Sequence, residues 1–340
     1  MALVETNRGS WGGNGTAWGS STSTTKVTTS FTPSNSSLLL VVFGGLNDGG
    51  GDQDISTFTI TDSVGLTWTQ RIAVNTTYSG AVEAATIYWT APVTSGAPMT
   101  ITIGHSASWT FTAAAEAMLQ AFDFTGYHGS SPVGVSGTAT NTGDAGYTLT
   151  LSGSPASDSI VLGNVFQSND TAGNHTASPG SGCTEEYDSA SSTFGHLQTQ
   201  TRTGVTTASM AWVDTTSGVT FSSNSIAAAL EIKAGRPTID SQPADTSAYN
   251  EFTAQFTVSA TASSGSLTYQ WQKSIDRCAS YSDVSGGSGA TTATYTTPSL
   301  LFSDHETFFR CNVSDALGTT PTRGAALRIN PRASGAWVRN

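Results

Sequence analysis

The chain has 340 residues, and only 11% of them are charged, against about 25% in a typical globular domain. Hydrophobic residues make up 37%, which is enough to fill proper cores and excludes a disordered chain. Residues 1–232 carry a net charge of −12 and residues 233–340 one of +1, so no basic face is available for nucleic acid, and an anionic membrane would repel the acidic surface.

Short apolar or alternating segments separated by turn residues recur through the first two thirds of the chain. Residues 38–43 form an uninterrupted apolar run after Ser37, which predicts a strand buried on both faces. Residues 113–124 begin with an alanine-rich stretch that could pass for a helix, but the alternation over 118–124 favours a strand. Further strands are expected at 58–61, 66–72, 85–90, 99–103, 147–151, 159–163, 209–213 and 227–232. This pattern predicts one large β-sandwich or jelly-roll-like domain over residues 1–235.

A glycine-rich loop after the first long strand carries three carboxylates, Asp48, Asp52 and Asp54. Carboxylate oxygens are ligands for calcium, but the spacing lacks the bidentate glutamate of an EF-hand loop. The alternative is a solvated turn between two strands. Calcium is therefore the one cofactor that the sequence offers, and otherwise we expect none.

Six tryptophans lie in the first domain, at positions 11, 18, 68, 89, 109 and 212. Trp68 and Trp212 alternate with polar residues in expected strands, which favours core positions. Trp11 and Trp18 lie in glycine-rich sequence and are expected on a contact surface, with a protein favoured over a glycan as the partner.

No pattern of catalytic residues stands out. Glu185, Glu186 and Asp188 are near neighbours in an expected loop, whereas glycosidase carboxylates flank a substrate from two sides. The five histidines are scattered, and no HxH, HExxH or GxSxG pattern occurs near them. We expect a protein that is not an enzyme.

A domain boundary is expected around residues 233–237, where a strand ends, glycine and proline appear and the charge balance changes. Residues 236–330 have the length of one immunoglobulin-type domain, and residues 331–340 form a tail. Arg332, Trp337 and Arg339 in this tail are expected contact residues, together with Trp11 and Trp18. We therefore expect a homo-oligomer with the chain ends in its interfaces.

Residues 267–273 and 308–318 resemble the C and F strands of bacterial and phage immunoglobulin-like domains. In that family a strand-C tryptophan packs on a strand-F cysteine, and an aromatic residue stands two positions before the cysteine. Trp271, Cys311 and Phe309 match these positions. The resemblance implies a sandwich without the inter-sheet disulfide, because residues 255–258 contain no cysteine. It also implies a buried Cys311, a more exposed Cys278 and no bridge between them.

The first domain is similar in style to β-sandwich domains of tailed-phage structural proteins and of some bacterial surface proteins. No apolar run reaches membrane-spanning length, and the start lacks the features of a secretory signal, so synthesis in a cytoplasm is expected. These resemblances imply a non-enzymatic virion protein, assembled in the host cytoplasm. The expected role is head decoration, or next a tail fibre or spike, in contact with major capsid or tail proteins. The alternatives are an adhesin for host-surface glycans and a carbohydrate-active enzyme.

Overall fold

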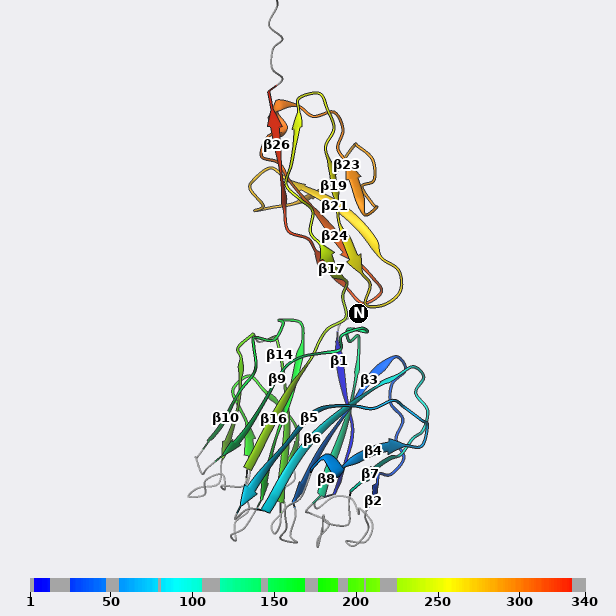
Figure 1. The fold of residues 1–340 in the computed structure, drawn as a ribbon, viewed down its shortest axis with the longest axis vertical. Helices are drawn as coiled ribbons and strands as arrows, with labels where there is room; N and C mark the ends of the chain where they lie inside the picture. Colours follow the sequence, from blue (N-terminus) through cyan, green and yellow to red (C-terminus); the bar gives the residue numbers. More distant parts are fainter. Residues whose placement is uncertain are drawn as a thin grey trace, which may run out of the picture. The chain divides into compact units, whose positions relative to one another are not determined.

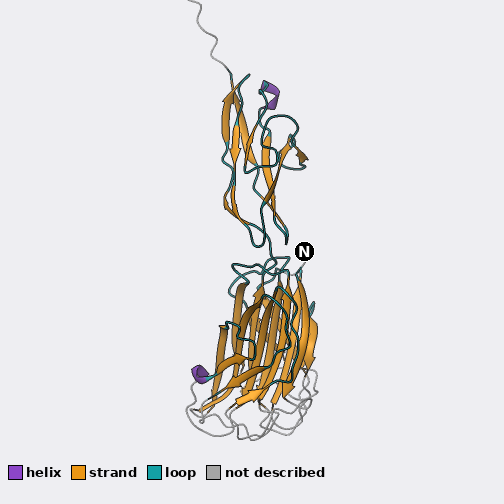
Figure 2. Cartoon of the chain, turned by 90° about the vertical axis from the view of Figure 1, so that its right-hand side faces the viewer, coloured by secondary structure: helices purple, strands orange, loops and turns teal. Residues whose placement is uncertain are grey.

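The computed structural model describes residues 3–12, 25–46, 55–78, 81–105, 117–141, 146–168, 177–188, 195–204, 206–214 and 225–331. Over these ranges the chain consists of β-strands, loops and short 3-10 turns, without an α-helix, which confirms the all-β prediction (Figures 1 and 2). It divides into two compact units. The larger contains residues 3–127 and 131–234, and the other centres on residues 235–340 with residues 128–130.

The first half of the larger unit, residues 3–127, is called the first module. Its larger sheet has the order β1-β8-β3-β6-β5, and its smaller sheet has the order β2-β7-β4. A short 3-10 turn, η1 (Ile55–Thr57), precedes β4. The strands are β1 (Val4–Gly12), β2 (Thr25–Val27), β3 (Ser37–Leu46), β4 (Thr59–Asp62), β5 (Thr69–Tyr78), β6 (Ala81–Val93), β7 (Ile101–Gly104) and β8 (Ala117–Thr125).

The second half, residues 131–234, is called the second module and is also made of a larger and a smaller sheet. The larger sheet has the order β13-β14-β11-β16-β9, and the smaller has the order β10-β15-β12. The strands are β9 (Val133–Asn141), β10 (Gly146–Thr150), β11 (Ile160–Ser168), β12 (Ala177–Pro179), β13 (Thr184–Asp188), β14 (Gly195–Thr203), β15 (Ser209–Asp214) and β16 (Ser225–Ile232).

The two modules have the same strand order. When the described strands of each module are counted from its own start, both larger sheets have the order 1-8-3-6-5 and both smaller sheets the order 2-7-4. The chain alternates between the two sheets as in a jelly roll, with the fifth strand added to the edge of the larger sheet. The sequence predicted one large jelly-roll-like domain over residues 1–235. The described residues of this region form one compact unit, and within it the strands make two jelly-roll modules.

The modules pack through their five-stranded sheets, and this explains the uninterrupted apolar run in β3. Leu39, Val41 and Phe43 face the smaller sheet of the first module, whereas side chains on the opposite face of β3 enter a core shared with β11 and β16. Tyr88 of β6 crosses this shared core, and its hydroxyl lies 2.7 Å from Asn164 Oδ1 and 3.0 Å from the carbonyl oxygen of Ala228. Each larger sheet is therefore buried on both faces.

A pair of carboxyl groups lies at one border of this shared core. Glu5 of β1 has one buried oxygen without a hydrogen-bond partner, and Thr201 donates to Glu186 Oε1 over 2.7 Å. Burial, together with the nearby Glu186 carboxylate, raises the pKa of Glu5 to about 8. The folded state prefers neutral Glu5, whereas the unfolded chain ionises this carboxyl group at its ordinary pKa of about 4.5. The folded protein therefore loses stability as the pH rises from about 4.5 through about 8.

We expect Glu5→Gln to flatten this pH dependence, because the amide keeps the shape of the neutral acid but does not ionise. At pH 8.5 the variant should be more stable than the wild type, by on the order of 2 kcal/mol, and the two proteins should be nearly equal at pH 4. Urea unfolding at both pH values measures this, with the exposed Glu185→Gln as the matched control. Parallel pH profiles for wild type and Glu5→Gln would refute the burial of Glu5.

The smaller unit has the arrangement of an immunoglobulin-like sandwich. One sheet has the order β18-β26-β24-β21-β22, with β25 on β24, and it faces the pairs β17-β20 and β19-β23. A 3-10 turn, η3 (Phe302–Asp304), precedes β24. The strands are β17 (Thr238–Ser241), β18 (Thr246–Tyr249), β19 (Gln255–Thr257), β20 (Ser259–Thr261), β21 (Thr268–Ser274), β22 (Ser282–Asp283), β23 (Thr294–Thr296), β24 (Phe308–Ser314), β25 (Thr319–Pro321) and β26 (Ala325–Asn330).

Aromatic rings fill the centre of the immunoglobulin-like unit. Trp271 and Cys311 are register partners on β21 and β24, and both are fully buried. Phe256 of β19 faces them from the other sheet, with ring centroids 6.3 Å from Trp271 and 4.7 Å from Phe309. The phenylalanine thus fills the strand position from which a cystine would reach Cys311 in antibody domains.

Candidate functional site

Large apolar side chains are exposed on the loops of the immunoglobulin-like unit. Ile275 is 84% exposed and Phe302 59%, although apolar side chains of this size are commonly buried. Tyr249 and Phe252 contact each other edge to face, with their ring centroids 6.4 Å apart. We call this set the apolar loop cluster; its members are Tyr249, Phe252, Ile275, Leu301 and Phe302.

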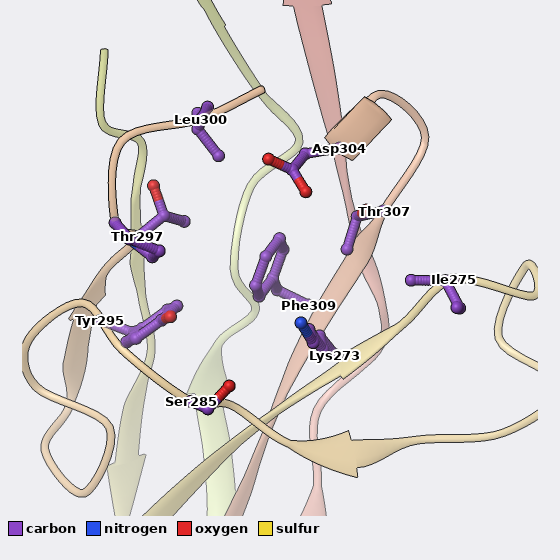
Figure 3. Close-up of a pocket in the computed structure, with 10 residues that line it drawn as sticks. Lys273, Ile275, Ser285, Tyr295, Thr297, Leu300, Asp304, Thr307 and Phe309 are labelled. Atoms are coloured by element: carbon purple, nitrogen blue, oxygen red, sulfur yellow. The ribbon is translucent and has the colours of Figure 1, made fainter. Parts of the chain in front are cut away.

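A small pocket opens between the loops that carry this cluster (Figure 3). Phe309 lies at its centre, with Asp304 and Thr307 on one side and Tyr295 on the other. The enclosed volume is about 60 Å³. Because one water molecule needs about 10–15 Å³ by the same measure, the pocket has room for a few waters or one side chain.

Polar contacts fix the loops around the pocket. The Asp304 carboxylate accepts a hydrogen bond from the backbone N–H of Leu301 over 2.7 Å. Backbone hydrogen bonds of 2.8 and 2.9 Å join Glu251 and Phe252 to Leu300. Arg277 and Glu306 form an exposed ion pair of 3.4 Å, which links the loop after β21 to the loop before β24.

Four residues of these loops have left-handed backbone angles although none is a glycine. The φ values are 73° for Glu251, 57° for Arg277, 70° for Cys278 and 61° for Glu306. Such conformations are uncommon outside glycine and cluster at sites where a loop has a fixed, functional shape. Together with the exposed apolar side chains, they make this end of the unit the best candidate for a contact surface.

The pocket is lined by both apolar and polar side chains. Lys273 and Asp304 are the charged residues that line it. Among the residues whose structure is described, no group of three or more His, Cys, Asp or Glu side chains could hold a metal ion. The site can therefore accept an apolar group and orient it with a few polar contacts.

The three residues expected in the immunoglobulin-like core lie together. Trp271, Phe309 and Cys311 belong to one buried cluster, and Trp271 Nε1 donates to the carbonyl oxygen of Thr292 over 2.8 Å. Phe309 has no hydroxyl group for a corner hydrogen bond, and its ring instead packs on Phe256.

Trp11 is a correction, because it is a core residue and not part of a contact surface. Its side chain is 5% exposed, and Nε1 donates to Thr29 Oγ1 over 2.8 Å. The ring packs on Phe31 and lies over Gly9, where a Cβ atom would approach it to 3.2 Å. The glycine-rich sequence around Trp11 suggested an exposed segment. Gly9 instead leaves room for the Trp11 ring, because it has no side chain.

Several expected site residues lie outside the described residues. These are the candidate calcium ligands Asp48, Asp52 and Asp54, and the candidate contact residues Trp18, Arg332, Trp337 and Arg339. The acidic segment around Glu186 is described and was expected to be a loop. It forms strand β13 instead, at the edge of the second module's larger sheet.

The cysteines differ strongly in exposure. All three are free, Cys278 is exposed and Cys311 is buried, and burial raises the pKa of the Cys311 thiol to about 11. Because the thiolate is the reactive form, a thiol reagent should label native Cys278 quickly and Cys311 only after unfolding. Peptide mass spectrometry after timed labelling measures both rates. Equal rates in the native protein would contradict the packing of Cys311 under Trp271.

Two buried carboxylates of the larger unit had no signal in the sequence. Asp123 accepts hydrogen bonds from Arg8 and from the backbone N–H of Ser34, the latter over 2.7 Å. Glu231 accepts from the backbone N–H groups of Val135 and Ala156, both over 2.8 Å. Each lies between apolar neighbours in a strand, but their partners are far away in the chain.

Comparison with protein-family models gives a match in the smaller unit. A family model described as "Domain of unknown function (DUF8696)" matches residues 236–331. No curated protein sequence matches the chain.

None of the described segments forms an apolar helix of membrane-spanning length.

Solved structures with detectable likeness contain immunoglobulin repeats. Tandem Ig repeats of Dlar are 13% identical with a TM-score of 0.26, covering 58% of this chain and 90% of that one. The N-terminal Ig1-2 module of the Drosophila receptor protein tyrosine phosphatase DLAR is 10% identical with a TM-score of 0.25, covering 59% and 100%. The N-terminal four Ig domains of Dscam1 are 13% identical with a TM-score of 0.25, covering 56% and 49%.

Proposed function

We propose that this chain is a non-enzymatic structural protein of a tailed-phage particle, with head decoration as its first role and a tail fibre or spike as the second. One observation carries the proposal: two jelly-roll modules and an immunoglobulin-like unit that has an apolar loop cluster on its surface. Jelly rolls with many short strands recur in viral capsid proteins. The low content of charged residues suits a surface that must stay folded outside a cell.

The apolar loop cluster is the proposed contact with a neighbouring particle protein. A few side chains, often aromatic, that become buried in pockets of the partner provide most of the affinity in many protein interfaces. The pocket of about 60 Å³ would take one apolar side chain of the partner. Residues 331–340 are a second proposed contact, with a capsid or tail protein or with a further copy of this chain.

Adding the purified chain to particles made without it tests the proposal. We expect saturable binding with a fixed number of copies per particle. Phe302→Ser should weaken it about tenfold, the effect of one well-placed apolar contact, whereas Val64→Ser on the larger unit serves as the matched exposed control. Failure of the wild-type chain to bind would reject the particle role. Equal binding by Phe302→Ser would reject this surface alone.

A glycan-binding adhesin is the second candidate, because jelly rolls also occur in lectins and exposed aromatic rings can stack on sugars. The exposed rings of Tyr249, Phe252 and Phe302 favour it. A glycan array separates the two candidates. Binding that is lost in Tyr249→Ala would support the adhesin, and an array without binding would leave the particle contact as the function.

A further inference from the structure

The third strands of the two modules correspond residue by residue. Residues 37–44 of β3 and residues 159–166 align without a gap, and Pro33 and Pro155 stand four residues before the aligned Ser37 and Ser159. Leu38 and Leu40 enter the shared core, and so do the aligned Ile160 and Leu162. The residues between them face the interior of their own module in both cases. Aligned residues of the two strands therefore point to the same side, either to the shared core or to the interior of their own module.

The buried carboxylates make the same connection in each module. Asp123 and Glu231 lie in the last strand of their modules and each accepts the backbone N–H of the residue after the aligned proline, Ser34 over 2.7 Å and Ala156 over 2.8 Å. Each is flanked by two side chains of the shared core, which are Phe122 and Phe124 in one module and Leu230 and Ile232 in the other. Both carboxylates thus tie the loop before the third strand to the last strand.

The turn after the fourth strand is also repeated. Gly65 and Gly182 both have positive φ, 83° and 77°. The next residue packs inward in each module, Leu66 against the core of the first and Cys183 against the core of the second. A threonine follows in both sequences.

The contacts between the modules have the reciprocity of a two-fold interface. Strand β3 lies against its counterpart β11. At one border β5 of the first module lies against β9 of the second. At the other border β1 meets β13, where Asn7 Nδ2 donates to the carbonyl oxygen of Glu186 over 3.1 Å. Because β1 corresponds to β9 and β5 to β13, the same two surfaces meet at both borders, as in an isologous dimer.

We propose that residues 3–127 and 131–234 are two copies of one module, whose described residues form eight strands in each copy, and that the five-stranded sheet is the surface through which the module pairs with its own copy. The larger unit is thus a dimer joined into one chain. The partner that fits this surface is a second module of the same kind.

The two copies differ in the side chains that fill their interiors. Strand register matches Ile87, Trp89 and Ala91 of β6 with Gln198, Gln200 and Arg202 of β14. In the second module Gln200 Nε2 donates to the carbonyl oxygen of Ala211 over 2.8 Å, and Arg202 Nη2 donates to that of Thr207 over 2.7 Å. Three apolar interior positions of β6 are therefore polar in β14, although the rest of the second module's interior is apolar as well. The strand order and the pairing face are shared.

A full-length chain with a protease site inserted between the exposed Ser130 and Ser131 tests the pairing. After folding and cleavage, we expect residues before and after the cut to elute together in size-exclusion chromatography. The equivalent substitutions Leu40→Asp and Leu162→Asp should each separate the fragments, whereas Val64→Asp at an exposed site should not. If the two fragments of the chain without an aspartate substitution separate after cleavage, the proposal is overturned.

Milder variants keep the test informative where the aspartate variants fail to fold. Leu40→Ala and Leu162→Ala in the uncut chain should lower the urea midpoint of the larger unit by the same amount. The double variant should depart from the sum of the two shifts, because both side chains belong to one shared core. Clearly unequal single shifts, or strict additivity, would contradict two equivalent positions in one pairing surface.

Discussion

Replacing Trp271 by alanine is expected to lower the unfolding free energy of the immunoglobulin-like unit by about 3–5 kcal/mol. The side chain is fully buried among Phe256, Tyr295 and Cys311, so its removal leaves a cavity. The hydrogen bond to the carbonyl oxygen of Thr292 is lost as well. Since a domain of this size has a total stability of about 5–15 kcal/mol, the variant unit would be marginal at 37 °C.

Differential scanning calorimetry of the full chain measures this effect. The larger unit has its own cores, so only the transition of the smaller unit should move. Trp271→Phe is the matched control, because it keeps an aromatic ring and should lose clearly less stability. If Trp271→Ala lowers both transitions equally, the two units do not unfold as separate bodies.

Replacing Asp123 by alanine is expected to destabilise the larger unit by about 3 kcal/mol. Asp123 is fully buried, and its carboxylate is bound by Arg8 and by the Ser34 N–H. Burial opposes its ionisation, but hydrogen bonds from Arg8 and Ser34 outweigh this and lower the pKa of Asp123. The stability that it provides is therefore present above about 3.8, the ordinary value, and is lost as the pH falls below it.

Urea unfolding of a double-mutant cycle separates this pair from its surroundings. The combined variant Arg8→Ala with Asp123→Ala should lose less than the sum of the two single variants, because the single variants leave a partner without its ion pair. Asp123→Asn keeps the size of the side chain and tests the charge alone. A loss below about 0.5 kcal/mol for Asp123→Ala, the range of ordinary surface substitutions, would contradict a structural role.

Local patterns predicted the fold class and the core of the smaller unit well. Alternation over residues 118–124 correctly placed β8, and the resemblance to immunoglobulin-like domains placed Trp271 and Cys311 on two strands that the structure pairs directly. Strand periodicity succeeds because it depends on residues that are close in sequence. The tryptophan–cysteine pair succeeds because the two residues are register partners on neighbouring strands.

The two modules were not recognised as copies from the sequence, because they share strand order and facing more than they share residue types. Ile87 and Trp89 match Gln198 and Gln200, so hydropathy differs at aligned positions. The carboxylates Asp123 and Glu231 reach partners that are distant in the chain, and no local pattern reports such contacts. Trp11 was misplaced for a similar reason, since only the fold brings Phe31 against its ring.

The apolar loop cluster was not predicted from the sequence. Phe302 and Ile275 are ordinary apolar residues in the sequence, and their exposure follows from loops whose shape depends on the left-handed Arg277, Cys278 and Glu306. Left-handed angles at non-glycine residues have no reliable local signature. The pocket between these loops therefore became visible only in three dimensions.

Quantitative mass spectrometry of purified phage particles tests the central claim most directly. We predict that peptides from this chain stay with the particles through successive density gradients, at a constant ratio to the major capsid protein. The fixed ratio reports defined binding sites on an ordered assembly. A ratio that falls toward zero with each purification step would show that the chain is not a component of the particle.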